Sequence, residues 1–119
     1  MAITAQLIGS LGGTQLEAIP VSKGRMTGAG AVHNLMTVTV PAGERRLVLV
    51  DGTMTHGETL ANYSPHLQVG SISTAGFKSG PATAGAVVTA DTAISVVTNH
   101  YSGSRTVEFT GTVYIVDPD

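Results

Sequence analysis

Charge and aromatic rings are scarce in this chain of 119 residues, and cysteine is absent. Charged residues make up 12% of it, against about 25% in typical soluble domains. The absence of cysteine excludes disulfides, thiolate metal sites and a cysteine nucleophile. Because only six residues are lysine or arginine and the formal net charge is −2, the composition argues against a surface for nucleic acid or anionic membrane.

Long hydrophobic runs are also missing. No stretch of about 18 apolar residues occurs, so no transmembrane helix is expected. Residues 1–6 lack the basic segment and apolar core of a signal peptide, and none is expected. The length fits one domain, and we predict a single domain over residues 1–119.

Small and hydroxyl-bearing residues take the place of charge. The chain has 15 glycines and is rich in Thr, Ser, Ala and Val. Two interpretations stay open at this point. Either neighbouring subunits cover much of the surface, so that little charge is needed for solubility, or Thr-rich strands simply form good β-structure.

Residues 36–52 carry the clearest local pattern. Thr and Val alternate over 37–40, which is the period of a strand with one buried face. Pro41 predicts the end of that strand, and the apolar run 47–50 predicts a second one buried on both faces. The Asp-Gly pair at 51–52 predicts a tight hairpin turn.

Similar patterns recur along the chain. The last predicted strand places Val107, Phe109, Val113 and Ile115 on one face, with Gly111 as a predicted bulge or bend. Pro20 predicts that its strand lies at a sheet edge or a bulge. About eight strands, with turn signals every ten residues or so, predict an all-β fold, an antiparallel jelly-roll-like β-sandwich. The other predicted strands span 3–7, 16–22, 66–72, 86–90, 93–98 and 105–116, and the predicted long loops span 23–31, 56–65 and 73–85.

No catalytic, cofactor-binding or metal-binding motif is found. The four histidines lack metal-ligand spacing, and no Gly-x-Ser-x-Gly elbow occurs. The glycines of 24–30 lack the Lys-Ser/Thr ending of a phosphate-binding loop. Asp51, His56 and Glu58 could form a cation site or an acid–base pair, but a solvated hairpin end is favoured. We therefore expect no enzyme and no cofactor.

Aromatic residues offer one candidate binding surface. Tyr63 and Tyr101 fall in predicted loops, where exposed rings could stack on sugars, while Phe77 and Tyr114 are weaker candidates. With His56 and Arg25, these two tyrosines are our candidate contacts to a partner or a glycan.

The segment 38–50, Val-Thr-Val-Pro-Ala-Gly-Glu-Arg-Arg-Leu-Val-Leu-Val, resembles a strand–turn–strand pattern of small jelly-roll modules in tailed bacteriophages. The segment 106–116, Thr-Val-Glu-Phe-Thr-Gly-Thr-Val-Tyr-Ile-Val, resembles their last strand. The resemblance implies a non-enzymatic virion protein that decorates capsids or builds head fibres and tail tips. It also implies a homo-oligomer, often a trimer. The chain lacks a fibrous extension, which favours a capsid decoration protein.

Two functional hypotheses follow. In the first, the chain binds the major capsid protein or other virion proteins on the outside of the shell. The contacts would come from the first residues, from the loops 23–34 and 56–66, and from a strand edge. In the second, it is a carbohydrate-binding β-sandwich module at a phage tail, using Tyr63 and Tyr101.

Overall fold

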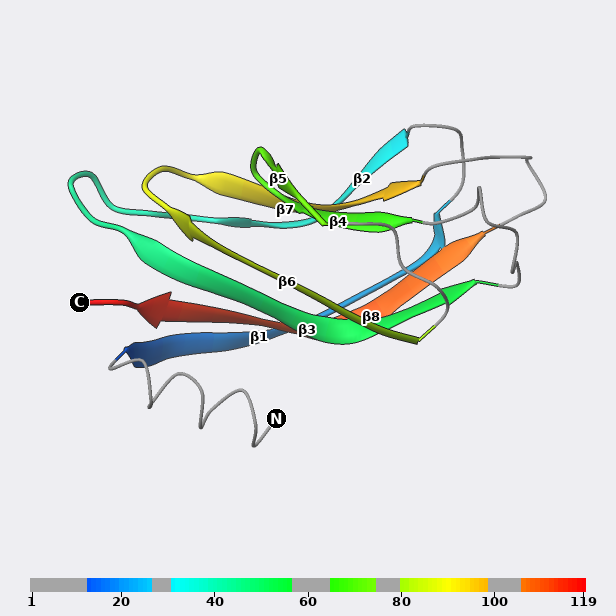
Figure 1. The fold of residues 1–119 in the computed structure, drawn as a ribbon, viewed down its shortest axis with the longest axis horizontal. Helices are drawn as coiled ribbons and strands as arrows, with labels where there is room; N and C mark the ends of the chain where they lie inside the picture. Colours follow the sequence, from blue (N-terminus) through cyan, green and yellow to red (C-terminus); the bar gives the residue numbers. More distant parts are fainter. Residues whose placement is uncertain (1–12, 27–30, 57–64, 75–79, 99–105) are drawn as a thin grey trace.

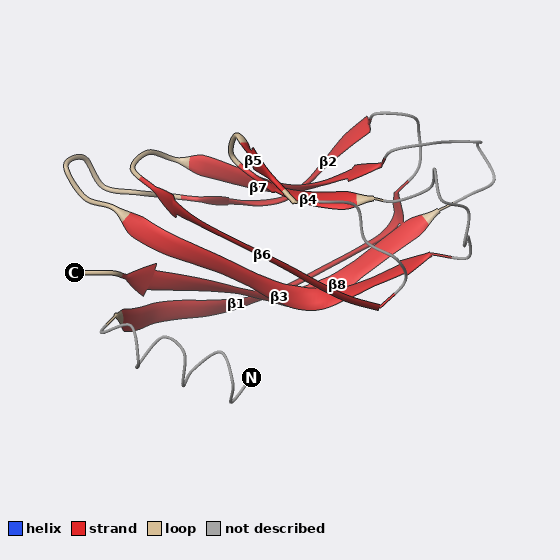
Figure 2. Ribbon diagram, in the orientation of Figure 1, coloured by secondary structure: helices blue, strands red, loops and turns tan. Residues whose placement is uncertain are grey.

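A computed structural model describes residues 13–26, 31–56, 65–74, 80–98 and 106–119. These residues form eight strands and no helix, arranged as two antiparallel sheets that face each other (Figures 1 and 2). The strands are β1 (Thr14–Met26), β2 (Ala31–Val38), β3 (Arg46–His56), β4 (His66–Val69), β5 (Ile72–Ser73), β6 (Gly80–Val88), β7 (Thr92–Thr98) and β8 (Val107–Asp117).

The strand order is that of a jelly roll. Sheet A has the order β1-β8-β3-β6 and sheet B the order β2-β7-β4-β5. The first strand pairs with the last, β2 with β7, β3 with β6 and β4 with β5. The chain is thus one long hairpin of paired strands, rolled so that successive pairs lie in alternate sheets. The predicted all-β, antiparallel jelly-roll-like sandwich of eight strands is confirmed.

The core lies between the sheets and follows the strand alternation. Val107, Phe109, Val113 and Ile115 of β8 all point into it and are buried, as their spacing predicted. Residues of β7 and β4 meet them from sheet B, among them Ile94 and Leu67. Burying one such side chain contributes about 1.5–3 kcal/mol to folding.

The hairpin turn predicted at Asp51-Gly52 is wrong. Strand β3 runs through both residues, which pair with β6 on one side and β8 on the other. Asp51 therefore belongs to the middle of a strand, between Thr83 and Thr112, and not to a solvated hairpin end. Gly111 is not a bulge either, because the register of β8 with both neighbours is continuous there.

Other boundaries shift for similar reasons. Strand β1 extends to Met26, although 23–31 was predicted to be a loop, and β6 already begins at Gly80. The strand predicted over 66–72 is broken by a turn at Gly70, whose φ of 61° is left-handed. The edge position predicted for Pro20 is confirmed, since among the described strands β1 pairs only with β8. The strand predicted over 3–7 lies outside the described residues.

The connection from β2 to β3 is the predicted Pro-Ala-Gly turn. Gly43 has a φ of 81°, and the N–H of Glu44 donates to the carbonyl of Pro41 at 3.1 Å. The N–H of Val40 donates to Oδ1 of Asp91 at 2.9 Å. This bond ties the end of β2 to the turn between β6 and β7, so the two connections form one end of the sandwich.

Candidate functional site

One end of sheet A gathers two of the nominated residues. His56, the last residue of β3, pairs with Val107, the first residue of β8. Met26, the last residue of β1, pairs with the same Val107. Arg25 and the backbone of His56 therefore lie at the same end of sheet A, with β8 between them (Figure 1). The side chain of His56 lies outside the described part.

Arg25 stands in an irregular part of its strand. The register of β1 with β8 shifts between Lys23 and Met26, and Arg25 has a φ of 55°. The left-handed region is unfavourable for residues with a Cβ and is found at turns, strained sites and functional sites. Arg25 is exposed, so its guanidinium is accessible to a partner.

The nominated tyrosines lie outside the described residues. Tyr63 belongs to 57–64, which follows the end of β3, and Tyr101 belongs to 99–105, which lies between β7 and β8. The end of β7 at Thr98 and the start of β8 are at the same end of the sandwich as His56 (Figure 1). The described residues that flank both tyrosine-bearing segments therefore lie at this end, which we call the loop end.

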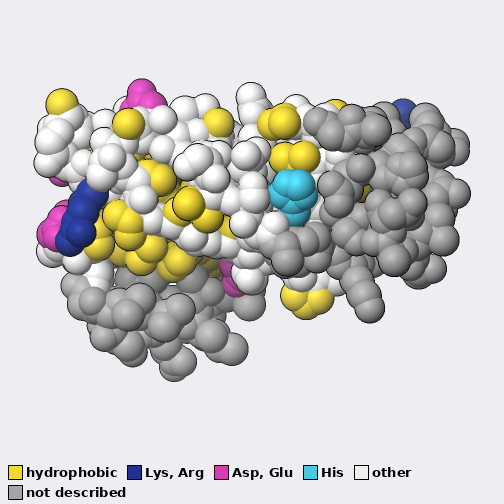
Figure 3. Space-filling model, turned by 45° about the horizontal axis from the view of Figure 1, so that its top comes forward, with side chains coloured by type: hydrophobic (Ala, Val, Ile, Leu, Met, Phe, Trp, Pro, Cys, Tyr) yellow, Lys and Arg dark blue, Asp and Glu magenta, His cyan; other side chains and the backbone are white. Residues whose placement is uncertain are grey.

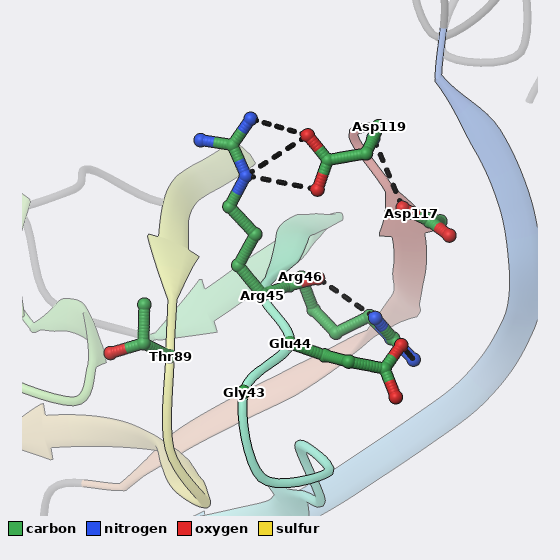
Figure 4. A pocket seen from close by; sticks show the side chains of 7 residues that line it. All are labelled: Gly43, Glu44, Arg45, Arg46, Thr89, Asp117 and Asp119. Atoms are coloured by element: carbon green, nitrogen blue, oxygen red, sulfur yellow. Dashed lines mark hydrogen bonds and ion pairs between the residues drawn. The ribbon is translucent and has the colours of Figure 1, made fainter.

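The opposite end carries a charged depression of about 550 Å³ (Figure 4). It is formed by the turn before β3, the residues after β6 and the last residues of the chain. Its lining residues are Gly43, Glu44, Arg45, Arg46, Thr89, Asp117 and Asp119.

Two ion pairs occupy this depression. The guanidinium of Arg45 faces the carboxylate of Asp119, with Nη2 2.6 Å from Oδ1 and Nε 3.1 Å from Oδ2. Arg46 donates from Nη2 to Glu44 at 3.1 Å and from Nη1 to the carbonyl of Arg45 at 2.8 Å. The hydrogen bond from Arg45, followed by its charge, lowers the pKa of Asp119, and the same bond raises the pKa of Arg45.

The charged side chains of the depression hold parts of the fold together. Its carboxylates accept hydrogen bonds from guanidinium groups or from the backbone, and Asp117 accepts one from the N–H of Asp119 at 3.0 Å. Arg45 and Asp119 are 74 positions apart, so their pairing fastens the residues after β8 to the turn before β3. The described residues contain no group of three or more His, Cys, Asp or Glu side chains that could hold a metal ion.

The outer face of sheet A is divided into two halves. Side chains on that face form cross-strand rows, which the register of β8, β3 and β6 defines. Two rows are apolar: Val116 with Leu47 and Val87, then Tyr114 with Leu49 and Gly85. The next rows carry mainly hydroxyls, from Thr53, Thr55, Thr83, Thr110 and Thr112, with Asp51 among them.

The apolar half forms a second, small cluster. Tyr114 and Val116 are buried, and the half-buried Leu47 and Leu49 pack against them. The run 47–50, predicted to be buried on both faces, is fully buried on its inner face and half-buried on its outer face. Tyr114 is no stacking surface, because only 5% of it is exposed. Sequence reasoning missed this cluster, since the outward positions of β8 change from Thr to Tyr and Val only near its end.

Charged side chains are few on the face shown in Figure 3, where hydrophobic side chains gather beside Lys/Arg and Asp/Glu atoms at the left.

Comparisons with protein families, with curated proteins and with solved structures found no match to this chain. The part of the chain that the structure describes has no helix of the length and hydropathy needed to cross a membrane.

Proposed function

We propose that this protein is a non-enzymatic structural component of a bacteriophage virion, a capsid decoration protein that binds the outside of the shell. The observation that carries the proposal is the arrangement of the loop end. It brings together Arg25, the end of β3 at His56 and the described strand ends from which the segments with Tyr63 and Tyr101 continue. A rigid two-sheet body would present these contact segments to the shell from one end.

The mechanism would be mechanical. Each copy would place its loop end across a junction between subunits of the major capsid protein. Single contacts of a surface with few charges are weak, but many copies on a repeating lattice, and several loop ends in one homo-oligomer, multiply them. A trimer is the oligomer that the phage resemblance favours.

Two further observations support a structural role. The charged depression at the opposite end contains paired side chains that clasp the fold, and its lining has no imidazole or thiol. The low charge of the chain fits a protein whose surface is partly covered by neighbours in an assembly.

The test is binding of the purified chain to phage heads from which the corresponding protein has been removed. Co-sedimentation should recover the chain with the heads, and immunogold labelling should place it on the head surface. Arg25→Ala should weaken this binding, whereas Arg45→Ala, at the opposite end, should leave it unchanged. A folded chain that does not bind heads at any concentration would overturn the proposal.

The competing function is sugar binding at a phage tail. Phe109 and Tyr114, the aromatic residues of the described part, are buried, so the sugar hypothesis depends on Tyr63, Tyr101 and the weaker candidate Phe77, which lie outside the described residues. Glycan binding that Tyr63→Ala or Tyr101→Ala abolishes would replace our proposal with this one. If neither substitution changes glycan binding, the stacking surface does not exist.

A further inference from the structure

Four of the described strands lie at sheet edges, and three of them carry features that discourage pairing with another strand. β1 contains Pro20, charged side chains and two register shifts against β8. β2 has a register shift between Asn34 and Met36, and β5 has only two residues. Bulges, prolines, charges and short length are the usual means of protecting a sheet edge.

The fourth edge, β6, is long and regular. Its nine residues, Gly-Pro-Ala-Thr-Ala-Gly-Ala-Val-Val, include no charged side chain, and its register with β3 has no shift. Pro81 removes a backbone donor near its start only. Among the described elements, β3 is its only ladder partner, while β4 lies near it from the facing sheet.

The side chains of β6 leave room for a neighbouring strand. Thr83, Gly85 and Val87 are exposed on the outer face, and Val87 keeps 54% of its surface accessible. Gly85 lies near the middle of the strand and has no side chain. A strand that is long, uncharged and unprotected is the type of edge that pairs with a further strand.

We propose that β6 pairs antiparallel with β6 of a second copy, so that the two sheets A become one continuous eight-stranded sheet. The strand is self-complementary for this pairing. A two-fold axis beside Gly85 sets Gly85 against its counterpart and Val87 of one copy beside Thr83 of the partner. No like charges oppose each other, and the cross-strand row that Val87 shares with Leu47 continues onto Thr83 of the second copy.

The β6 pairing does not rest on the proposed capsid role, and it predicts a dimer where the phage resemblance favours a trimer. A two-fold contact between identical edges closes at two copies, whereas a trimer needs a different, head-to-tail contact. Pairing without binding to heads would therefore refute the capsid role alone. Trimers that bind heads would refute the β6 pairing alone.

The test compares two charged variants of the full chain. Thr83→Lys with Val87→Lys puts two lysines on the β6 edge without touching the core. Val32→Lys with Thr37→Lys is the matched control, because both residues are exposed on β2, an edge strand of sheet B on the side of the sandwich away from β6. Sedimentation velocity over a concentration series gives the monomer–dimer midpoint, and circular dichroism verifies the fold of each variant.

We expect wild type to form dimers, with a midpoint raised at least tenfold by the β6 lysines and changed less than twofold by the β2 lysines. Amide hydrogen exchange of wild type provides a readout without substitutions: amides of 82–88 should gain protection as concentration rises. A wild type that stays monomeric, forms trimers or responds equally to both variants would overturn the proposal. Protection of the amides of 82–88 that appears only on phage heads would also overturn the proposal. In that case β6 would pair with a strand of the shell and not with a second copy of this chain.

Discussion

Gly52 of β3 and Gly111 of β8 are directly paired on adjacent strands of sheet A, at a point where neither strand has room for a side chain. A Cβ at Gly52 would lie 2.5 Å from the carbonyl oxygen of Thr110 and 2.6 Å from Cζ of Phe109. A Cβ at Gly111 would lie 2.5 Å from the carbonyl oxygen of Asp51. Neither glycine has a positive φ, so close approach and not turn formation explains both.

Gly52→Ala should therefore destabilise the fold by about 1–3 kcal/mol, because backbone atoms must move to admit the methyl group. Urea unfolding followed by circular dichroism measures the loss. Gly85→Ala is the matched control on β6. Its Cβ meets Cδ2 of Leu49 at 3.0 Å, and a flexible side-chain end can shift. Equal losses in the two variants would contradict the role assigned to the Gly52–Gly111 pair.

Phe109→Ala should cost about 3–5 kcal/mol, since the ring is fully buried between the sheets. The ring also contributes to the crowding at Gly52. Adding Gly52→Ala to Phe109→Ala should therefore cost at least about 0.5 kcal/mol less than Gly52→Ala alone costs in wild type. A double-mutant cycle in urea measures this coupling, and strict additivity would show that the ring and the glycine do not interact.

Asp91→Ala should lower stability by about 1 kcal/mol, because the N–H of Val40 loses the carboxylate that accepts its hydrogen bond. Asp91→Asn keeps an acceptor oxygen in the same place and should retain most of the stability. Thermal and urea unfolding of the three proteins gives the comparison. If the alanine and asparagine variants are equally destabilised, charge and not hydrogen bonding is what Asp91 supplies.

The Arg45–Asp119 pair should make a small part of the stability dependent on acid pH. Because the folded-state pKa of Asp119 is lowered, its contribution is present above the ordinary pKa of Asp. The contribution disappears as pH falls through the lowered value. The effect is small, since both side chains are more than half exposed.

An NMR titration of the Asp119 carboxylate tests this. Arg45→Gln should raise the pKa of Asp119 toward its ordinary value, because the guanidinium that stabilises the charged form is gone. Lys23→Gln, which removes a cation elsewhere on sheet A, is the control and should leave the titration unchanged. A titration curve of Asp119 that is identical in wild type and Arg45→Gln would show that the pair does not persist in solution.

Much of the fold could be predicted because strand alternation is a local property. The inward set of β8 and the turn at Pro41 to Gly43 follow from neighbouring residues, and the structure confirms both. The prediction at Asp51-Gly52 failed because an Asp-Gly pair has two uses in β-proteins. It can supply positive φ at a turn, or it can leave space for a neighbouring strand, and only the position of Gly111 decides between these.

The candidate site was less predictable, because its parts come together from distant positions. The sequence alone determined that the chain is all-β, which positions face inward, that charge is scarce, and that cysteine and metal-ligand spacing are absent. Each follows from composition or from a period of two residues. Tertiary structure decided which strands pair, which edges stay open, and that Arg45 meets Asp119. Such pairings are made across long stretches of chain, and local periodicity does not specify a partner.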